Sequence, residues 1–243
     1  VKTEIEELKK RFGDERRTQV VSHGVKEFAA EDLIPNEPTI VMITRDGYIK
    51  RMPPETFRTQ SRGGKGVIGL TTREEDVVEQ LFSTTTHADL LFFTTRGRVF
   101  QLKAYDVPAA SRTAKGQALV NFLQLAATEK VSAVLAAPDL REEKYLVMVT
   151  RNGIIKKTDI SDFESVRRSG LIALRLRDDD TLEWVKPSTG KDEIILITAQ
   201  GQSIRFREND VRPMGRVASG VHGMRMQKGD QVVGMDVVAP SIA

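Results

Sequence analysis

Apolar and polar positions along the chain form a pattern that recurs four times after residue 39. Each copy has an apolar run, a threonine, two further residues, a glycine and a second run of apolar and basic residues. The copies read IVMITRDGYIKRM, LLFFTTRGRVFQL, YLVMVTRNGIIKK and IILITAQGQSIRF, and their glycines are Gly47, Gly97, Gly153 and Gly201. The runs are short and rich in β-branched residues, and Asp-Gly or Asn-Gly accepts the positive φ angles of a tight turn. Each copy therefore predicts a β-hairpin.

Each copy continues with one more apolar position, a loop that ends in glycine, and two further strand-like segments. The apolar position comes ten residues after the hairpin glycine, at Phe57, Val107, Phe163 and Val211. Four short strands in a period of about fifty residues are typical of a propeller blade. We therefore predict an all-β, propeller-like fold of four-stranded blades, with four repeats visible at about 39–88, 89–144, 145–192 and 193–238.

The first residues of the chain follow a different period. Ile5, Leu8 and Phe12 recur at spacings of three and four, which predicts one apolar face of a short helix. One such helix does not fold alone, so we interpret it as the end of a larger preceding region. The predicted organisation is a helical remnant over 1–18, a proline-interrupted linker over 19–38, the repeats over 39–238 and a tail over 239–243.

Composition excludes several classes of function. The formal net charge is only +3, and cysteine is absent, which excludes disulfides, thiolate nucleophiles and cysteine-ligated zinc. No apolar run approaches the roughly 20 residues of a membrane span, and the N-terminus lacks a signal sequence, so a cytoplasmic protein is expected. The three histidines have no metal-ligand spacing, and no nucleophile and base are recognisable. We expect neither a metal site nor catalytic residues in this chain, and we interpret the acidic segments REEDVVEQ (73–80) and RDDD (177–180) as solvated turns rather than cation ligands.

The loops that end in glycine contain the candidate functional residues. They read QSRGGKG, ASRTAKG, VRRSG and MGRVASG, and an arginine lies five residues beyond the apolar position in each: Arg62, Arg112, Arg168 and Arg216. Lys65, Lys115 and Arg167 add a second charge in three of the loops. A single surface arginine is most simply solvated. Equivalent positions of successive blades point the same way, however, so four arginines predict a basic belt along the rim.

Six further basic residues lie in or just after the second strand of three hairpins, and they are candidates for extending this belt. An ordinary polar strand face explains them equally well. They are Lys50, Arg51, Lys156, Lys157, Arg205 and Arg207.

A curved basic belt suits the phosphate backbone of duplex DNA, which is a regular line of negative charge. No recognition helix and few loop aromatics are evident, so we expect binding through phosphates and DNA bendability, with weak sequence preference. A nucleotide-binding P-loop does not fit QSRGGKG, because the first glycine and the Ser or Thr after the lysine are both missing.

QSRGGKG at 60–66 resembles the A-box found in the A subunit of bacterial DNA gyrase, whose usual form is Gln, a basic residue, Arg, Gly, Gly, a basic residue, Gly. The segments RFGDERRT, FFTTRGRVFQLKAYDVPAASRTAKG and VRPMGRVASGVHGMRM are also similar to that family, so the resemblance covers about Lys9 to Val238. Ser61 departs from the pattern, since the family usually has a basic residue there. One possible phosphate contact is thereby removed.

The resemblance implies a β-pinwheel, a propeller variant in which neighbouring blades exchange strands. It implies a non-catalytic domain that wraps double-stranded DNA around its basic rim, with positive handedness, and so enables negative supercoiling by the holoenzyme. The DNA-binding residues would be the box, Gln60, Ser61, Arg62, Gly63, Gly64, Lys65 and Gly66, followed by Arg112, Lys115, Arg167, Arg168 and Arg216.

The resemblance also implies a context for the domain. Cleavage of DNA, ATP and Mg²⁺ would belong to other parts of the type IIA topoisomerase, and the gyrase B subunit would join a heterotetramer through the preceding region. The isolated domain would be monomeric, in the bacterial cytoplasm at the nucleoid. The family ring has six blades, whereas four are visible here, so either a truncated or a naturally shortened, open pinwheel is expected.

Three alternatives remain at this point. The first is the equivalent domain of topoisomerase IV, from the subunit that corresponds to gyrase A, whose box is usually more degraded. The second is a propeller that serves as a protein-interaction platform for acidic partners. The third is an enzyme with its site in the central channel, which the apolar repeats do not favour.

Overall fold

The computed structural model describes residues 2–14, 18, 30–57, 59–66, 76–140, 142–177 and 179–240. The chain falls into two compact units, 1–35 and 36–243. The first unit contains helix α1 (Lys2–Phe12), where a helix was predicted, and the short helix α2 (Ala30–Leu33). Parts of the predicted linker (19–29) and tail (241–243) lie outside the described residues.

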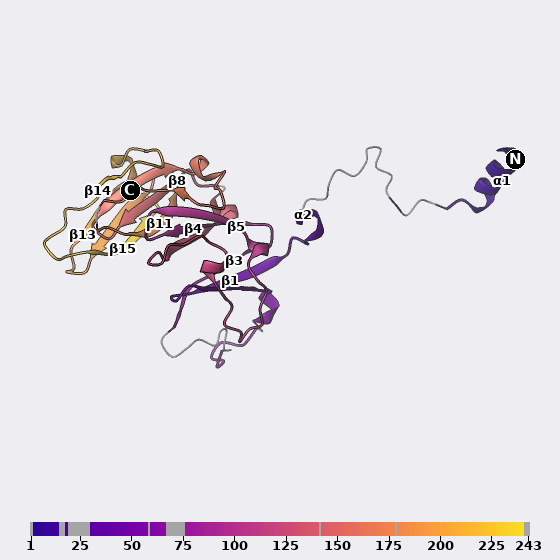
Figure 1. Ribbon diagram of the computed structural model, residues 1–243, viewed down its shortest axis with the longest axis horizontal. Coiled ribbons are helices and arrows are strands. Elements are labelled where there is room, and N and C mark those ends of the chain that lie inside the picture. Colours follow the sequence, from indigo (N-terminus) through magenta and orange to yellow (C-terminus); the bar gives the residue numbers. More distant parts are fainter. Residues whose placement is uncertain are drawn as a thin grey trace. The chain divides into compact units, whose positions relative to one another are not determined.

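The second unit is built from antiparallel sheets, and Figure 1 labels several of their strands. The first has the order β3-β1-β2-β6, with β1 (Pro38–Thr44), β2 (Tyr48–Met52), β3 (Val78–Thr85) and β6 (Gln117–Ala118). The second has the order β10-β5-β4-β7, with β4 (Asp89–Thr94), β5 (Arg98–Lys103), β7 (Val131–Ala136) and β10 (Leu171–Ile172). The third has the order β11-β8-β9-β14, with β8 (Tyr145–Thr150), β9 (Ile154–Asp159), β11 (Leu182–Ser188) and β14 (Val221–His222). The fourth has the order β13-β12-β15, with β12 (Glu193–Thr198), β13 (Ser203–Arg207) and β15 (Val232–Val238).

Six short 3-10 helices lie in the described connections, four of them directly after a hairpin and the other two after β6 and β7. They are η1 (Pro54–Thr56), η2 (Ala104–Asp106), η3 (Leu119–Asn121), η4 (Ala137–Leu140), η5 (Ile160–Phe163) and η6 (Glu208–Asp210). The recurring apolar residue after each hairpin lies at the end of four of them, and it is buried at Val107, Phe163 and Val211. At these three positions the residue therefore anchors the turn that leads out of the hairpin to the core.

All four predicted hairpins are present, and their recurring threonine has a structural role. Its side-chain oxygen accepts a hydrogen bond from the backbone N–H four residues later, which closes the turn. The N···O distances are 3.1 Å (Tyr48 to Thr44), 3.2 Å (Arg98 to Thr94), 3.1 Å (Ile154 to Thr150) and 3.2 Å (Gln202 to Thr198). These threonines are all buried, so the bond also satisfies a hydroxyl that would otherwise be costly to bury.

An acidic residue from the end of the repeat supports each hairpin turn from outside. Asp76, Asp180 and Asp230 accept hydrogen bonds from the turn amides of Asp46, Asn152 and Gln200, at 3.0–3.1 Å. The interpretation of REEDVVEQ and RDDD as merely solvated turns is therefore wrong at Asp76 and Asp180, which are 3% and 8% exposed. Their carboxylates replace water as partners of the turn amides.

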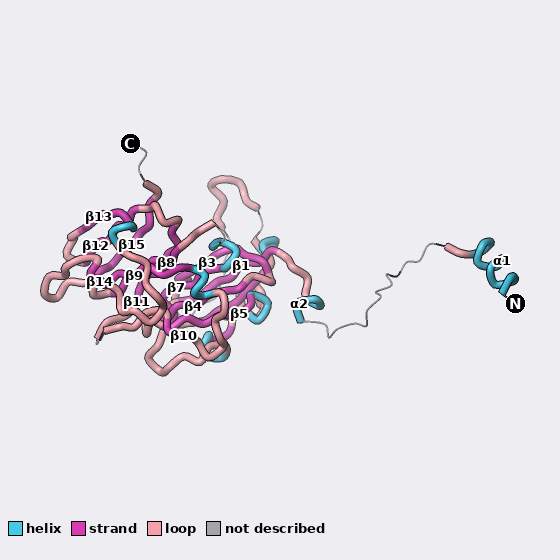
Figure 2. Tube along the Cα trace, turned by 90° about the horizontal axis from the view of Figure 1, so that it is seen from above, coloured by secondary structure: helices cyan, strands magenta, loops and turns pink. Residues whose placement is uncertain are grey.

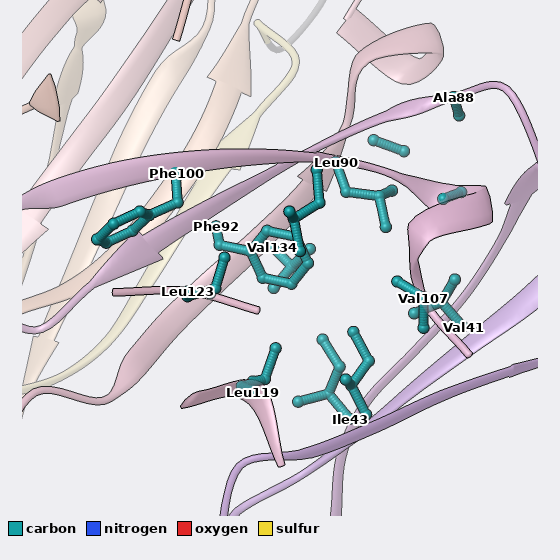
Figure 3. Close-up of a cluster of buried hydrophobic side chains, with 14 residues drawn as sticks. Val41, Ile43, Ala88, Leu90, Phe92, Phe100, Val107, Leu119, Leu123 and Val134 are labelled. Atoms are coloured by element: carbon teal, nitrogen blue, oxygen red, sulfur yellow. The ribbon is translucent and has the colours of Figure 1, made fainter. Parts of the chain in front are cut away.

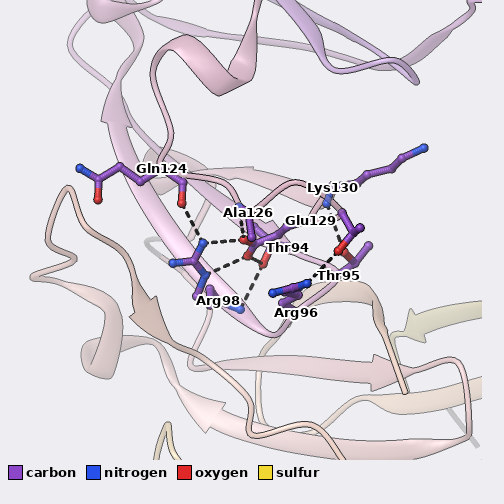
Figure 4. Close-up of polar contacts among 9 residues, drawn as sticks. Thr94, Thr95, Arg96, Arg98, Gln124, Ala126, Glu129 and Lys130 are labelled. Atoms are coloured by element: carbon purple, nitrogen blue, oxygen red, sulfur yellow. Dashed lines mark hydrogen bonds and ion pairs between the residues drawn. The ribbon is translucent and has the colours of Figure 1, made fainter. Parts of the chain in front are cut away.

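Glu129 takes this place in the second repeat and makes more contacts (Figure 4). Its carboxylate accepts from Arg98 (2.9 and 2.5 Å), from the Thr94 hydroxyl (2.6 Å) and from the Ala126 amide (3.0 Å). Burial alone would raise the pKa of this carboxyl, but the hydrogen bonds from Arg98, Ala126 and Thr94 outweigh burial and lower the pKa to about 2. Glu129 thus remains ionised well into the acid range.

The short strands exchange between repeats, as the pinwheel resemblance implied. Strand β6 belongs to the second repeat but pairs with β2 of the first, β10 pairs with β5, and β14 pairs with β9. In Figure 2, β14 lies beside β9. In each of these three sheets the following repeat contributes the outer strand, and the fourth sheet has three described strands.

The hydrophobic cores lie between successive sheets rather than within one repeat. In the first core, Val41 and Ile43 of β1 pack with Leu90 and Phe92 of β4, as Figure 3 shows. Two further clusters join the second repeat to the third and the third to the fourth. Each blade is therefore stabilised by its neighbour, through a separate apolar cluster between each pair of successive sheets.

Candidate nucleic-acid interface

The four predicted basic loops are structurally equivalent. In each, an arginine occupies the first central position of a β-turn, closed by a hydrogen bond of 3.0 Å (Gly64 to Ser61), 3.2 Å (Ala114 to Ser111), 2.9 Å (Gly170 to Arg167) or 3.1 Å (Ala218 to Gly215). A glycine with positive φ closes or follows each turn, at Gly66, Gly116, Gly170 and Gly220. The last three glycines lead directly into β6, β10 and β14. Arg112, Arg168 and Arg216 therefore lie on segments that cross from one blade to the next.

Most of the charges on these turns are open to solvent. Arg62, Lys65, Arg167 and Arg168 are exposed, and the Arg168 side chain is 85% accessible. The remaining three side chains, Arg112, Lys115 and Arg216, are half-buried.

Two of the half-buried side chains have defined positions. The Lys115 ammonium lies 3.6 Å from the centre of the Tyr48 ring, and Arg216 donates to the carbonyl of Asp162 at 3.1 Å. These contacts fix the direction of the two side chains, because each holds a long, flexible chain at its charged end.

The box residues Gln60–Gly66 form an exposed loop that is closed by its own side chain. The Gln60 Oε1 atom accepts a hydrogen bond from the Gly66 amide at 3.0 Å. A side chain at Gly64 would place its Cβ 2.6 Å from that same oxygen, so glycine is required there if Gln60 is to close the loop. The glutamine and the central glycine of the box therefore act together to shape the loop. Residues 67–75, which follow it, lie outside the described residues.

The prediction that the hairpin residues extend the exposed belt is wrong for three of the six. Lys50, Lys156 and Lys157 are 1%, 0% and 2% exposed, and their ammonium groups bind carbonyl oxygens inside the protein. Lys157 binds the Glu208 carbonyl at 2.9 Å and lies 3.4 Å from the buried Glu208 carboxylate. The alternation of a strand was misleading here. The turn of the next repeat binds Lys50 and Lys156, whereas Lys157 points to the opposite face of β9 and is bound by Glu208 at η6.

The other three hairpin residues remain accessible to different degrees. Arg51 is half-buried and donates to the Val107 carbonyl at 2.7 Å. Arg205 is exposed but paired with Glu193 at 2.6 Å, and Arg207 is exposed.

Burial changes the acidity of two of the lysines. It lowers the pKa of Lys50. It lowers the pKa of Lys156 to about 8, while Asp162 opposes and Arg216 reinforces that change. The carbonyl contacts are what make burial of these amino groups tolerable.

The described part of the chain contains no group of three or more acidic, histidine or cysteine side chains that could hold a metal ion. None of its described helices is both long enough and apolar enough to cross a membrane.

Comparison with known proteins gives a consistent family. A family model described as "DNA gyrase C-terminal domain, beta-propeller" matches residues 38–85, 88–138, 144–189 and 192–239, one match for each repeat. The chain is 44% identical over 98% of its length to the A subunit of DNA gyrase from Staphylococcus epidermidis (strain ATCC 12228 / FDA PCI 1200), and it spans 27% of that protein.

Two solved structures resemble the fold. The C-terminal domain of DNA topoisomerase IV gives a TM-score of 0.72 at 27% identity, covering 85% of this chain and 63% of that one. The DNA gyrase A C-terminal domain gives 0.64 at 25% identity, covering 83% of this chain and 65% of that one.

Proposed function

We propose that this chain, which belongs to the DNA gyrase C-terminal domain family, binds duplex DNA along its exchanged loops and wraps it around the rim of the pinwheel. The observation that supports this function most directly is the set of four equivalent turns, each with an arginine at the same position. Repetition on successive blades gives a line of positive charge, and a duplex offers a matching line of phosphates.

The proposed contacts are to the DNA backbone rather than to the bases. The candidates are the seven box residues and the basic side chains of the other three loops. Arg205 and Arg207 remain candidates at the fourth blade, whereas Lys50, Lys156 and Lys157 are buried and leave the set of direct contacts. Because loops of this kind read charge and bendability, we expect weak sequence preference and strong salt dependence.

The rest of the proposal concerns the larger enzyme, since the chain spans 27% of the gyrase A polypeptide to which it was compared. There the wrapped DNA would be presented for ATP-driven strand passage, which introduces negative supercoils. Residues 1–18 would be the end of the DNA-breaking region and 19–38 the linker to the pinwheel, with ATP, Mg²⁺ and the gyrase B subunit of a heterotetramer engaged elsewhere. The pinwheel itself would be a non-catalytic monomer that acts at the bacterial nucleoid.

A topoisomerase IV-type function is the second candidate, because the solved domain of that enzyme gives the higher TM-score, 0.72 against 0.64. The box favours the gyrase-type function. It retains Gln60, Arg62, Lys65 and all three glycines, which are the residues that form its closed loop and its charges.

The proposal is tested by sealing nicked plasmid in the presence of this chain and measuring the linking number after the protein is removed. We expect a positive shift that grows with protein concentration and disappears at high salt. Replacing residues 60–66 with alanine should abolish the shift and leave much of the binding, because the other three loops keep their charges. Binding without a shift in the unaltered chain would contradict wrapping and favour weak, topoisomerase IV-type binding.

A matched control separates the box from charge alone. Lys9→Ala with Lys10→Ala also removes two exposed positive charges, but from helix α1. This double variant should keep the full shift. A shift that survives replacement of the box, or that is lost in the control, would show that the box assignment is wrong.

A further inference from the structure

We propose that Lys50 and Lys156 are positioning residues, which hold the arginine-bearing turns of the following repeat in the shape that DNA requires without touching DNA themselves. The inference rests on the proposed DNA-binding function. Its structural half, the fixing of the turns, can be measured without DNA.

Lys50 lies on β2 of the first sheet but binds the turn of the second repeat. Its ammonium donates to the carbonyls of Ser111 (3.3 Å), Arg112 (2.6 Å) and Ala114 (2.8 Å). An ammonium group has three N–H donors, which is enough to bind all three carbonyls. The carbonyl of the arginine itself is one of the three, which ties the backbone of Arg112 directly to the preceding blade.

Lys156 repeats this arrangement two blades further along. It lies on β9 and donates to the carbonyls of Arg216 (2.5 Å) and Ala173 (2.6 Å). Again one partner is the carbonyl of the turn arginine. The other, Ala173, is fully buried, so the lysine links the fourth turn to the core of the third repeat.

The same position supports the exchanged loop in the blade that lacks a lysine. Phe100 occupies the position in its hairpin that Lys50 and Lys156 occupy in theirs. It lies opposite Phe92 in the second sheet, just as Lys50 lies opposite Met42 in the first and Lys156 lies opposite Met148 in the third. A Cβ built on Gly170 would lie 2.7 Å from the Phe100 ring, so this ring packs against the third loop. An apolar side chain therefore suffices for packing, and the lysines add carbonyl binding at the considerable cost of burying an ammonium group.

Binding the carbonyls has a consequence for an anion. The amides of Arg112, Thr113 and Lys115 make no hydrogen bond within the described part of the chain, while three carbonyls of the same loop are held by Lys50. A loop whose carbonyls are drawn to one side leaves its amides available to a phosphate, in the manner of other backbone anion sites. The lysine would thus act on both the arginine and the backbone amides beside it.

A double-mutant cycle tests the inference through the affinity for a labelled duplex at fixed salt. Lys50→Met keeps the apolar stem and removes the ammonium, and we expect binding to weaken about tenfold, the size of one lost charge-assisted contact. In the Arg112→Ala background the same change should weaken binding by clearly less than tenfold, because the part of its effect that acts through the Arg112 side chain is already lost. When Lys50→Met is combined with Arg216→Ala, the two fold-losses in affinity should instead multiply, because the two residues act on different turns.

The second lysine provides the matched control. Lys156→Met should be coupled to Arg216→Ala and independent of Arg112→Ala, the reverse of the Lys50 result. Multiplicative effects within either matched pair would overturn the inference, since they would mean that the lysine acts on binding by another route.

Amide hydrogen exchange without DNA tests the positioning itself. In Lys50→Met, exchange should increase at Ala114 and in β6, with β4 and β8 unchanged. An unchanged β6 would overturn the inference. If Lys50→Met does not fold, Lys50→Phe copies the residue that occupies this position in the second blade, and the same measurements apply. Failure of the unaltered chain to bind duplex would contradict the proposed function instead, and the exchange result would still decide whether the lysines fix the turns.

Discussion

Glu129 shows how much one buried group contributes to this fold. Its carboxylate joins Arg98, Thr94 and Ala126 at the hairpin turn of the second repeat. We predict that Glu129→Gln destabilises the protein by about 2–4 kcal/mol at pH 7, because Arg98 and the turn lose a charged partner that is almost fully buried. Urea unfolding of the variant and the unaltered chain measures this difference.

The pH dependence of that difference follows from the lowered pKa. The unfolded carboxyl has its ordinary pKa of 4.5 and the folded one about 2, so the stabilisation is complete above pH 4.5 and is lost as the pH falls towards 2. The gap between the two proteins should therefore shrink as the pH falls from 4.5 to about 2, a window set by those pKa values. Asp236→Asn is the control, since the Lys186–Asp236 pair is 41% and 64% exposed and should contribute less than about 1 kcal/mol. A gap that stays constant with pH would contradict the assigned ionisation.

At the residue scale the sequence predicted exposed charges better than buried ones. The turn arginines were found because they repeat at a fixed distance from an apolar position, and repetition is visible in a sequence. Lys50 and Lys156 were assigned to an exposed face, because a basic residue in a strand is ordinarily solvated. Their burial depends on a loop from the next repeat, more than fifty residues away, and no local pattern contains that information.

At the scale of elements, strand exchange depends on the glycine that precedes each exchanged strand. Gly116 has φ +86°, and a Cβ there would lie 2.5 Å from the Ile49 carbonyl oxygen of β2. Gly47 has a similar φ, +81°, but nothing lies within 4 Å of its Cβ position. We predict that Gly47→Ala costs about 1–2 kcal/mol for the backbone conformation alone, and that Gly116→Ala costs at least about 1 kcal/mol more.

The greater loss of stability in Gly116→Ala should arise at the pairing of β6 with β2. The added methyl group of Gly116→Ala must move β6 away from β2, so amide exchange should increase at Gln117 and Ala118 and at Leu119, whose amide binds the Gly47 carbonyl. Urea unfolding gives the two stabilities. Equal losses for both variants would mean that β6 has room to shift, and that the exchanged strand is held less closely than its contacts indicate.

The elements themselves were predictable to different degrees. The hairpins were found from alternating β-branched runs and turn dipeptides, and all four are present. The exchanged strands β6, β10 and β14 have two residues each, too few to form any pattern. Strand exchange was therefore expected from the family resemblance alone.

At the scale of the whole molecule, the prediction of an all-β, propeller-like repeat is confirmed, and three strands of the fourth sheet lie in the described part of the chain. A period of about fifty residues was enough to determine the class of fold. The period does not determine the number of strands in a sheet, because the outer strand of each of the first three sheets comes from the following repeat.

The arc of four turns predicts how binding depends on salt when the whole surface is considered. A side chain that neutralises one phosphate contributes about 0.9 to the slope of the logarithm of affinity against the logarithm of salt concentration. We predict that replacing Arg62, Arg112, Arg168 or Arg216 with alanine lowers the slope by about one unit each, and that combined replacements add. Fluorescence anisotropy on a duplex long enough to span the arc, repeated over a series of salt concentrations, measures the slope.

The same series maps the path of the DNA. Lys191→Ala removes an exposed charge outside the turns and should leave the slope unchanged. If the duplex follows all four blades, a progressively shorter duplex should lose contact with the turns one at a time. The change in slope caused by replacing the arginine at one end, Arg62 or Arg216, should disappear first. The changes caused by replacing its neighbours should then disappear in order. If replacing Arg62 changes the slope but replacing Arg216 does not, at any duplex length, the DNA path ends before the fourth repeat. The wrapping surface would then be limited to the first three blades, which have their exchanged strands in place.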